Sequence, residues 1–219
     1  MPKLKPDTQR ARREHILEAA EVCFARSGFH RTTMQDICKE ALISPGALYV
    51  YFASKEELIA GIVERDRAEF AERFAELSAA PDFMQALSDL GNHYFDEEPA
   101  YKRTMCLEIG LESTRNPKVG DIYRTVDRYV EDCFEKLFAR LAAEGRIAPD
   151  LDIATLAQVF SVIGDGMFMR RAVDPAFDAK TVVPAVMGLL GKLLNPVSET
   201  PAAGEPSQPR DAKAAEPRR

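Results

Sequence analysis

Apolar residues recur at intervals of three and four along most of this chain, and this helical spacing constrains the fold more than any other feature. Within residues 16–24, for example, the apolar side chains share one face of a helix. The alternation of apolar and polar residues that is typical of half-buried strands is absent from the sequence. The sequence therefore predicts an all-α fold of successive helices with short breaks.

The predicted helices begin and end at residues that favour helix termini. Gly28 tolerates a positive φ and is expected to end a first helix over about residues 8–27. Thr33, Ser44 and Ser54 are expected to cap the next three helices. Longer helices, separated by breaks that contain proline or glycine, are expected over residues 83–96, 100–114, 118–144, 153–171 and 179–194.

The charge of the chain is unevenly distributed. The formal net charge is −6, yet the first thirteen residues hold five basic side chains and one acidic side chain, Asp7. An acidic protein with a basic arm can bind DNA locally, because only the contacting surface must neutralise phosphate. The basic residues of this arm are Lys3, Lys5, Arg10, Arg12 and Arg13.

Several classes of protein are disfavoured by what the sequence lacks. The four cysteines are scattered, no CxxC occurs and the three histidines do not cluster with them, so neither a disulfide framework nor a zinc site is expected. We expect no metal and no cofactor. No apolar run approaches the roughly 18 residues of a membrane span, and the N-terminus lacks a secretory signal. A cytoplasmic location with no membrane partner is expected.

Residues 33–52 have the pattern of a helix-turn-helix motif. Two short helices, joined by three or four residues, follow a longer one. In the second, Leu48 and Phe52 are four apart and can anchor inward, which leaves Tyr49 and Tyr51 towards solvent near small residues. Such a surface fits a backbone that approaches DNA closely, with tyrosine hydroxyls on phosphates and small apolar groups on thymine methyls.

Residues 16–58 resemble the N-terminal domain of the TetR family of transcriptional regulators. The resemblance implies a homodimer that binds double-stranded operator DNA and releases it when a small, largely apolar effector binds. Repression follows family habit, and activation stays open. The residues that carry the resemblance are Ala20, Phe24, Gly28, Phe29, Thr33, Ile37, Ala41, Ser44, Gly46, Leu48, Tyr49, Tyr51, Phe52 and the segment 54–58.

The resemblance also implies the residues that contact DNA. They are Thr33, Gln35, Ser44, Pro45, Gly46, Ala47, Tyr49, Tyr51 and Lys55, to which charge and position add Arg10 and Arg13. One position departs from the family pattern. Leu42 stands in the turn where the family usually has glycine, so it must either avoid a strongly positive φ or accept strain of about 1 kcal/mol or more.

Four regions are expected along the chain. Residues 1–13 form a flexible basic arm, and residues 14–58 form the three-helix DNA-binding domain, with a connecting helix that continues to about residue 78. Residues 79–195 form a helical ligand-binding and dimerisation domain. Residues 196–219 are rich in proline, alanine and charge, and are expected to be disordered.

The C-terminal half resembles the family more weakly, mainly over residues 145–169. Candidate effector contacts are Met84, Leu87, Tyr94, Met105, Ile109, Tyr123, Phe134 and Asp165, with His93, Glu108 and Glu112 as further polar candidates. The implied dimer interface comprises Phe160, Gly164, Met167, Phe168, Val183, Val186, Met187 and Leu190. For each apolar candidate, the alternative is an ordinary place in the core.

Two other functions compete with the regulator. A helical interaction protein without DNA binding would share the same helices but not the tyrosine surface. An enzyme would need a carboxylate site, for which Glu108 and Glu112 are four apart on one helix face. The Glu-x-x-His repeats of di-iron bundles are missing, as are nucleotide-binding and nucleophile motifs, so catalysis is disfavoured.

Overall fold

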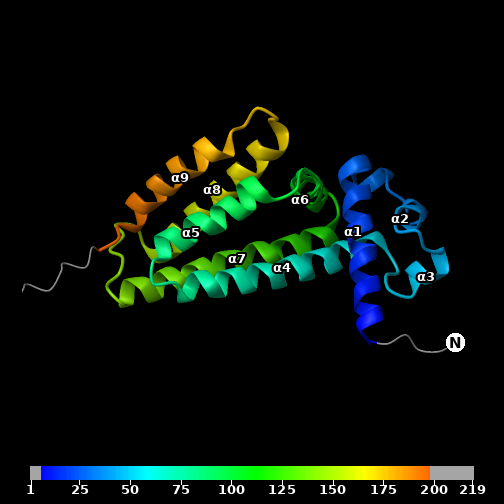
Figure 1. Ribbon diagram of the computed structural model, residues 1–219, viewed down its shortest axis with the longest axis horizontal. Helices are drawn as coiled ribbons and strands as arrows, with labels where there is room; N and C mark the ends of the chain where they lie inside the picture. Colours follow the sequence, from blue (N-terminus) through cyan, green and yellow to red (C-terminus); the bar gives the residue numbers. More distant parts are fainter. Residues whose placement is uncertain (1–5, 198–219) are drawn as a thin grey trace, which may run out of the picture.

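The computed structural model describes residues 6–197, and helices account for its regular structure (Figure 1). Within that range the β structure is limited to an isolated bridge between Ile147 and Pro196. The all-α prediction is confirmed. The helices are α1 Pro6–Arg31, α2 Met34–Glu40, α3 Pro45–Tyr49, α4 Lys55–Ala79, α5 Phe83–Asn92, the π-helical turn η1 His93–Glu97, α6 Ala100–Ser113, α7 Pro117–Ala143, α8 Ile153–Val173 and α9 Ala179–Leu194. Among these helices, none combines the length and apolarity that crossing a bilayer requires.

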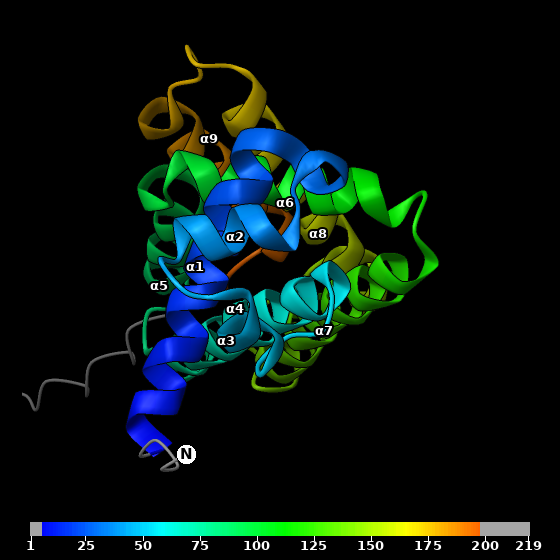
Figure 2. The ribbon, with the colours of Figure 1, turned by 90° about the vertical axis from the view of Figure 1, so that its right-hand side faces the viewer.

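The molecule consists of a small head and an elongated body. The head contains α1, α2, α3 and the start of α4, and it lies at one end (Figures 1 and 2). From the head, α4 runs through the body beside α7, while α5, α8 and α9 lie across from this pair. Helix α6 joins the two parts because it packs against α1 on one side and against α7 and α8 on the other.

The described N-terminus is more helical than expected. Helix α1 begins at Pro6, so residues 6–13 are part of a helix and not a flexible arm, while Lys3, Lys5 and residues 198–219 lie outside the described range. Gly28 has φ 76° and ψ 162°, which confirms that regular helix ends there. Residues 93–97 form a π-helical turn where continuous α-helix was expected.

The predicted caps are present. Oγ1 of Thr33 accepts a hydrogen bond from the N–H of Asp36, and the Asp36 carboxylate accepts one from the Thr33 N–H, which completes a capping box. Ser44 and Ser54 cap α3 and α4 through the N–H groups of residues 47 and 57. Local chemistry therefore sets the helix limits around the turn.

Two hydrophobic cores hold the chain together. The head core, which is built mainly from α1–α4, also contains Met105 and Ile109 of α6 and Val119 of α7. The body core contains buried side chains of α4, α5 and α7–α9. The boundary predicted near residue 79 therefore does not separate the cores, because α6 completes the head from the body side.

The predicted dimer interface is largely interior. Phe160, Met167, Val183, Met187 and Leu190 are buried in the body core, and Gly164, Phe168 and Val186 are half-buried. The assignment is corrected for the five buried residues, because helical periodicity identifies an apolar face but not whether the partner helix belongs to the same chain. Gly164, Phe168 and Val186 stay predictions. The opposite faces of α8 and α9 instead expose Val162, Met169, Val173 and Leu189.

Candidate DNA-reading head and effector cavities

The N-termini of α2 and α3 are both presented at the surface of the head (Figure 2). Thr33 and Gln35 are exposed at the start of α2. The hydrogen bonds from Thr33 hold the pKa of the Asp36 carboxyl below its usual value. The N–H groups of Thr33 and Asp36 are thus used within the capping box, and the exposed side chains of Thr33 and Gln35 are what the start of α2 presents to a ligand.

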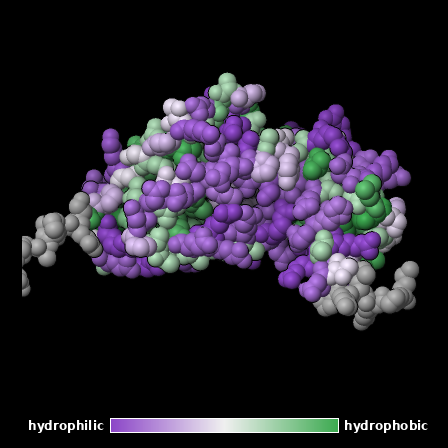
Figure 3. Space-filling view, viewed as in Figure 1, coloured by the Kyte–Doolittle hydropathy of each residue, from purple (hydrophilic) through white to green (hydrophobic). Residues whose placement is uncertain are grey.

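The turn between α2 and α3 is closed by a left-handed residue. Leu42 has φ 53° and its side chain is 90% exposed. The N–H of Ile43 donates to the carbonyl oxygen of Cys38 at 3.0 Å, which closes the end of α2. Leucine thus accepts the strained conformation that the family pattern assigns to glycine. Figure 3 shows an apolar patch where α2 and α3 meet, and the exposed apolar residues there include Leu42 and Val50.

Helix α3 buries one side and exposes the other, as the sequence predicts. Leu48 and Phe52 are buried in the head core. Tyr49 is 55% exposed, and Ser44, Pro45 and Gly46 are exposed beside it. A Cβ added at Gly46 would meet nothing within 4 Å, so the packing of this chain does not require glycine there. We call the exposed set Thr33, Gln35, Ser44, Pro45, Gly46 and Tyr49 the reading surface.

Three predicted DNA contacts are only half-exposed. These are Ala47, Tyr51 and Lys55. The Lys55 ammonium donates to the carbonyl oxygen of Phe29 and lies 4.2 Å from the centre of the Phe29 ring. Burial lowers the pKa of Lys55. In this structure Lys55 therefore ties the start of α4 to the end of α1.

The two arginines predicted from charge differ in their surroundings. Nη2 of Arg13 lies 2.8 Å from the Glu64 carboxylate, and the guanidinium also lies over the Phe52 ring. Arg10 is exposed and 3.6 Å from Asp7. Arg13 is thus engaged within the protein, whereas Arg10 lies at the surface of α1.

Side chains of α6 and α7 contact the head directly. Nε2 of His30 lies 2.8 Å from Oε2 of Glu112, and Nδ2 of Asn116 donates to Glu56 at 3.3 Å. The Glu108 carboxylate lies against Gly28, where an added Cβ would be 3.0 Å from Oε2. Glu108 and Glu112 were candidate ligand contacts and the basis of the enzyme alternative. Both instead lie at the junction of head and body.

Two neighbouring cavities lie in the body. The junction cavity, of about 570 Å³, is lined by α4, α6, α7 and α8, and the inner cavity, of about 240 Å³, lies between α4, α5, η1, α7, α8 and α9. Val130 and Phe168 line both. Of the predicted effector contacts, the first contains Met105, Ile109, Tyr123 and Asp165, the second contains Leu87, Tyr94 and Phe134, and Met84 lines neither.

The junction cavity is apolar but has an acidic part. Asp127 and Asp165 both line it. Burial, and then the charge of Asp127, raises the pKa of Asp165. Burial also raises the pKa of Tyr123 in the same wall. Helix α4 also lines the cavity, through residues that were not predicted from the sequence although the apolar spacing of α4 could have indicated them: Ile62, Val63, Asp66 and Arg67.

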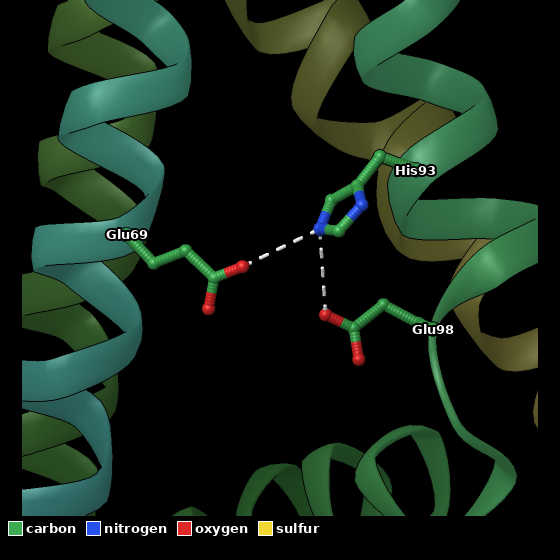
Figure 4. Close-up of side chains that lie close together, drawn as sticks. All are labelled: Glu69, His93 and Glu98. Carbon is green, nitrogen blue, oxygen red and sulfur yellow. Dashed lines mark ion pairs between the residues drawn. The ribbon is translucent and has the colours of Figure 1, made fainter.

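A separate polar cluster joins α4 to η1. Glu69, His93 and Glu98 place one potential ligand atom each within 4.8 Å of the others (Figure 4). Burial raises the pKa of Glu98. His93, predicted as a polar effector contact, therefore lies in this cluster and does not line either cavity.

A helix-turn-helix surface on a head that is packed against a cavity-bearing helical body defines a DNA-binding transcriptional regulator. The chain belongs to the TetR family. Residues 16–62 match "Bacterial regulatory proteins, tetR family", and residues 84–195 match "BetI-type transcriptional repressor, C-terminal". The fold class, the family and the DNA-binding regulatory function predicted from the sequence are confirmed.

Similar proteins agree with the assignment of this chain to the TetR family. The chain is 30% identical over 186 residues to the HTH-type transcriptional regulator UidR of Escherichia coli K12. The match covers 83% of this chain and 92% of UidR. Salmonella enterica GusR has a TM-score of 0.73 at 29% identity, and covers 84% of this chain and 95% of GusR. A Saccharomonospora viridis regulator in complex with choline has a TM-score of 0.69 at 22% identity, and the match covers 84% of this chain and 96% of that protein.

Proposed function

We propose that this regulator represses transcription in the cytoplasm as a homodimer and leaves its operator when a small effector enters the junction cavity. On this proposal the reading surface enters the major groove, with Tyr49 on a phosphate and Gly46 at the closest approach. Activation would require the same surfaces, so repression rests on the match to a repressor-type C-terminal domain.

One observation carries the coupling between effector and DNA. Met105 and Ile109 of α6 line the junction cavity and are also members of the head core. A ligand that contacts these side chains would therefore shift them within the head core, which positions α1 against α6. Helix α4 offers a second route, because Ile62 lines the same cavity and belongs to the same core. An effector changes DNA affinity only if it binds the two arrangements with different free energies.

The cavity favours an effector with a largely apolar body and a positive charge. Its volume of about 570 Å³ lies within the range of small-molecule sites, roughly 300–1,000 Å³. Asp66, Asp127 and Asp165 outnumber Arg67 among the charged residues that line it. Tyr123 supplies an aromatic wall that suits a cation, whereas the guanidinium of Arg67 already lies over the ring of Tyr129. The complex of the Saccharomonospora viridis regulator with choline shows that a relative of this fold binds a small cation.

The homodimer would pair the outer faces of α8 and α9. Val162, Met169 and Leu189 are exposed on these faces. A Cβ added at Gly166 or Gly188 would meet nothing within 4 Å, so the packing of one chain does not explain either glycine. Each mid-helix glycine costs about 1 kcal/mol relative to alanine, and close approach of a partner helix would offset that cost.

The test begins with selection of genomic DNA fragments that purified full-length protein binds, followed by fluorescence anisotropy on the selected site. Choline and its uncharged analogue 3,3-dimethylbutan-1-ol, which have similar shapes, then probe the cavity. We expect the cation to weaken DNA binding in the wild type and the uncharged analogue to have little effect. The response should fall in Asp165→Asn.

Glu72→Gln, an exposed substitution on α4, serves as the matched control and should respond like the wild type. Failure to enrich any fragment over a Tyr49→Ala variant would argue for a helical interaction protein. Enrichment that no cationic or uncharged ligand alters would remove the effector part of the proposal and leave DNA binding in place.

A further inference from the structure

The cluster of Glu69, His93 and Glu98 lies outside both cavities and outside the reading surface (Figure 4). Nε2 of His93 lies 3.5 Å from Oε1 of Glu69 and 3.9 Å from Oε1 of Glu98. A hydrogen bond would need about 2.7–3.2 Å. The buried Nε2 accordingly has no hydrogen-bond partner.

These separations fit the edges of a coordination shell better than they fit hydrogen bonds. Ligand atoms about 2.05 Å from a tetrahedral zinc ion lie about 3.3 Å apart. The two distances from His93 exceed this value by a few tenths of an ångström, which small side-chain rotations can remove. One histidine nitrogen and two carboxylates form a ligand set that zinc accepts.

A second, independent observation comes from Glu98. Its side chain is 9% exposed, and its Oε2 makes no hydrogen bond. The contacts of this buried carboxylate are loose, at 3.7 Å to Nζ of Lys102 and 3.9 Å to Nε2 of His93, and a buried charge without close partners is costly. A cation closer to it would stabilise it. Figure 4 shows one oxygen of the Glu98 carboxylate, Oε1, directed at the imidazole of His93, and the other oxygen directed away from it.

The surroundings also orient the histidine. Nδ1 of His93 lies 3.4 Å from Oε2 of Glu97. This contact is also longer than a usual hydrogen bond, but a carboxylate beside one imidazole nitrogen favours the tautomer in which the other nitrogen has its lone pair free for a metal. Glu97 and His93 are the last and first residues of η1, and π-helical turns often occur at functional sites.

Two cations compete with a metal at this place. Nζ of Lys102 lies 3.7 Å from Glu98 and 3.9 Å from Glu69, and Nη2 of Arg73 lies 3.2 Å from Glu69. Lys102 is beyond hydrogen-bond distance from both carboxylates, so a divalent ion would displace a loose partner there. At Glu69 the ion would have to share Oε1 with Arg73, which donates hydrogen bonds to that oxygen, or displace it.

We propose that Glu69, His93 and Glu98 bind one divalent transition-metal ion, of which Zn²⁺ fits best, with water completing the coordination shell. The ion fastens the middle of α4 to η1 and to the segment that leads into α6. It thereby connects the helix that leaves the head with the helix that completes the head core. The site is independent of the effector cavities.

The experiment uses full-length protein stripped with EDTA under reducing conditions. Zn²⁺ is titrated in competition with the chromophoric chelator 4-(2-pyridylazo)resorcinol, and thermal unfolding is followed in parallel. We expect one Zn²⁺ per chain and a melting temperature that rises with free Zn²⁺. His93→Gln and Glu98→Gln should each lower the affinity by at least about tenfold.

Lys102→Met should raise Zn²⁺ affinity, because it removes the competing cation. If the cluster had a purely structural role, Lys102→Met would not raise Zn²⁺ affinity while His93→Gln and Glu98→Gln lower it. Glu72→Gln on the same helix is the control and should bind like the wild type. Absence of stoichiometric binding in the wild type would overturn the proposal, as would binding that survives both His93→Gln and Glu98→Gln through the cysteines.

Discussion

Nε2 of His30 lies 2.8 Å from Oε2 of Glu112, and this contact connects the last turn of α1 to α6 across the boundary between head and body. Glu112 is 4% exposed, whereas His30 is largely accessible. Because Gly28 redirects the chain just before His30, the short segment after it points at α6. The pair therefore lies in the interface between head and body, through which an effector would act on the reading surface under the proposed function.

The first prediction concerns this pair. A double-mutant cycle with His30→Ala and Glu112→Gln should give a coupling of about 0.5–1 kcal/mol in the free energy of unfolding, since one partner is buried. Urea denaturation measures it. A control cycle on Arg124 and Asp121, 2.7 Å apart on the exposed surface of α7, should give less. Equal coupling free energies in the two cycles would mean that the contact at the junction is no stronger than an exposed surface pair.

The second prediction tests the reading surface. Tyr49→Phe removes a hydroxyl that we place on a phosphate, and a hydrogen bond to a charged group contributes about 1.5–3 kcal/mol. We expect operator affinity to fall by about tenfold or more, with thermal stability unchanged, because Tyr49 is exposed. Anisotropy on the selected site measures the affinity. Tyr129→Phe, in the wall of the junction cavity, should bind DNA normally.

The third prediction concerns the turn. Leu42 has φ 53°, a conformation that costs a side-chain residue about 1–2 kcal/mol. Leu42→Gly relieves this strain but adds about 0.4–1 kcal/mol of chain entropy to the unfolded state. The net gain in the free energy of unfolding should be about 0.5 kcal/mol by chemical denaturation. Leu42→Ala keeps the strain, so a similar gain in that variant would contradict the explanation.

The fourth prediction follows from Glu21, whose side chain is 1% exposed and 2.5 Å from Nη2 of Arg65. Its second oxygen has no hydrogen-bond partner, and burial raises the pKa of Glu21. The stability that this group contributes is therefore full below its unfolded pKa, about 4.3, and declines as pH rises through the folded pKa.

Glu21→Gln should consequently flatten the decline of stability above about pH 4.3. Arg65 keeps Asp66 at 2.8 Å, so the substitution does not leave the guanidinium unpaired. Denaturation curves at several pH values measure the slope. The exposed Glu18→Gln on the same helix should retain the wild-type slope, and an identical slope in Glu21→Gln would count against a raised pKa.

The fifth prediction tests the proposed dimer. Val162→Asp and Leu189→Asp each place a charge on the outer face of α8 or α9. If these faces meet a second chain, the charge would be buried without a partner, and each variant should sediment as a monomer with weakened operator binding. Leu151→Asp, exposed between α7 and α8, should leave the wild-type assembly intact. Unchanged sedimentation in both α8 and α9 variants would move the interface elsewhere.

The sequence alone determined the helices and the helix-turn-helix. Caps at Thr33 and Ser44, the glycine at residue 28 and prolines at the breaks act through their own backbone neighbours, so their effects are readable along the chain. The inward pair Leu48 and Phe52 follows from the same local spacing. Exposure of Tyr49 was predictable for this reason.

Only the tertiary structure decided which surface each helix meets. Periodicity gave Phe160 and Val183 an apolar face but could not say that the partner lies within the chain. It likewise could not pair Lys55 with Phe29, turn Glu112 towards His30, or bring Glu69 near His93. The physical reason is that spacing describes contacts within one helix, whereas burial, ion pairs and cavities arise between helices that are distant in sequence.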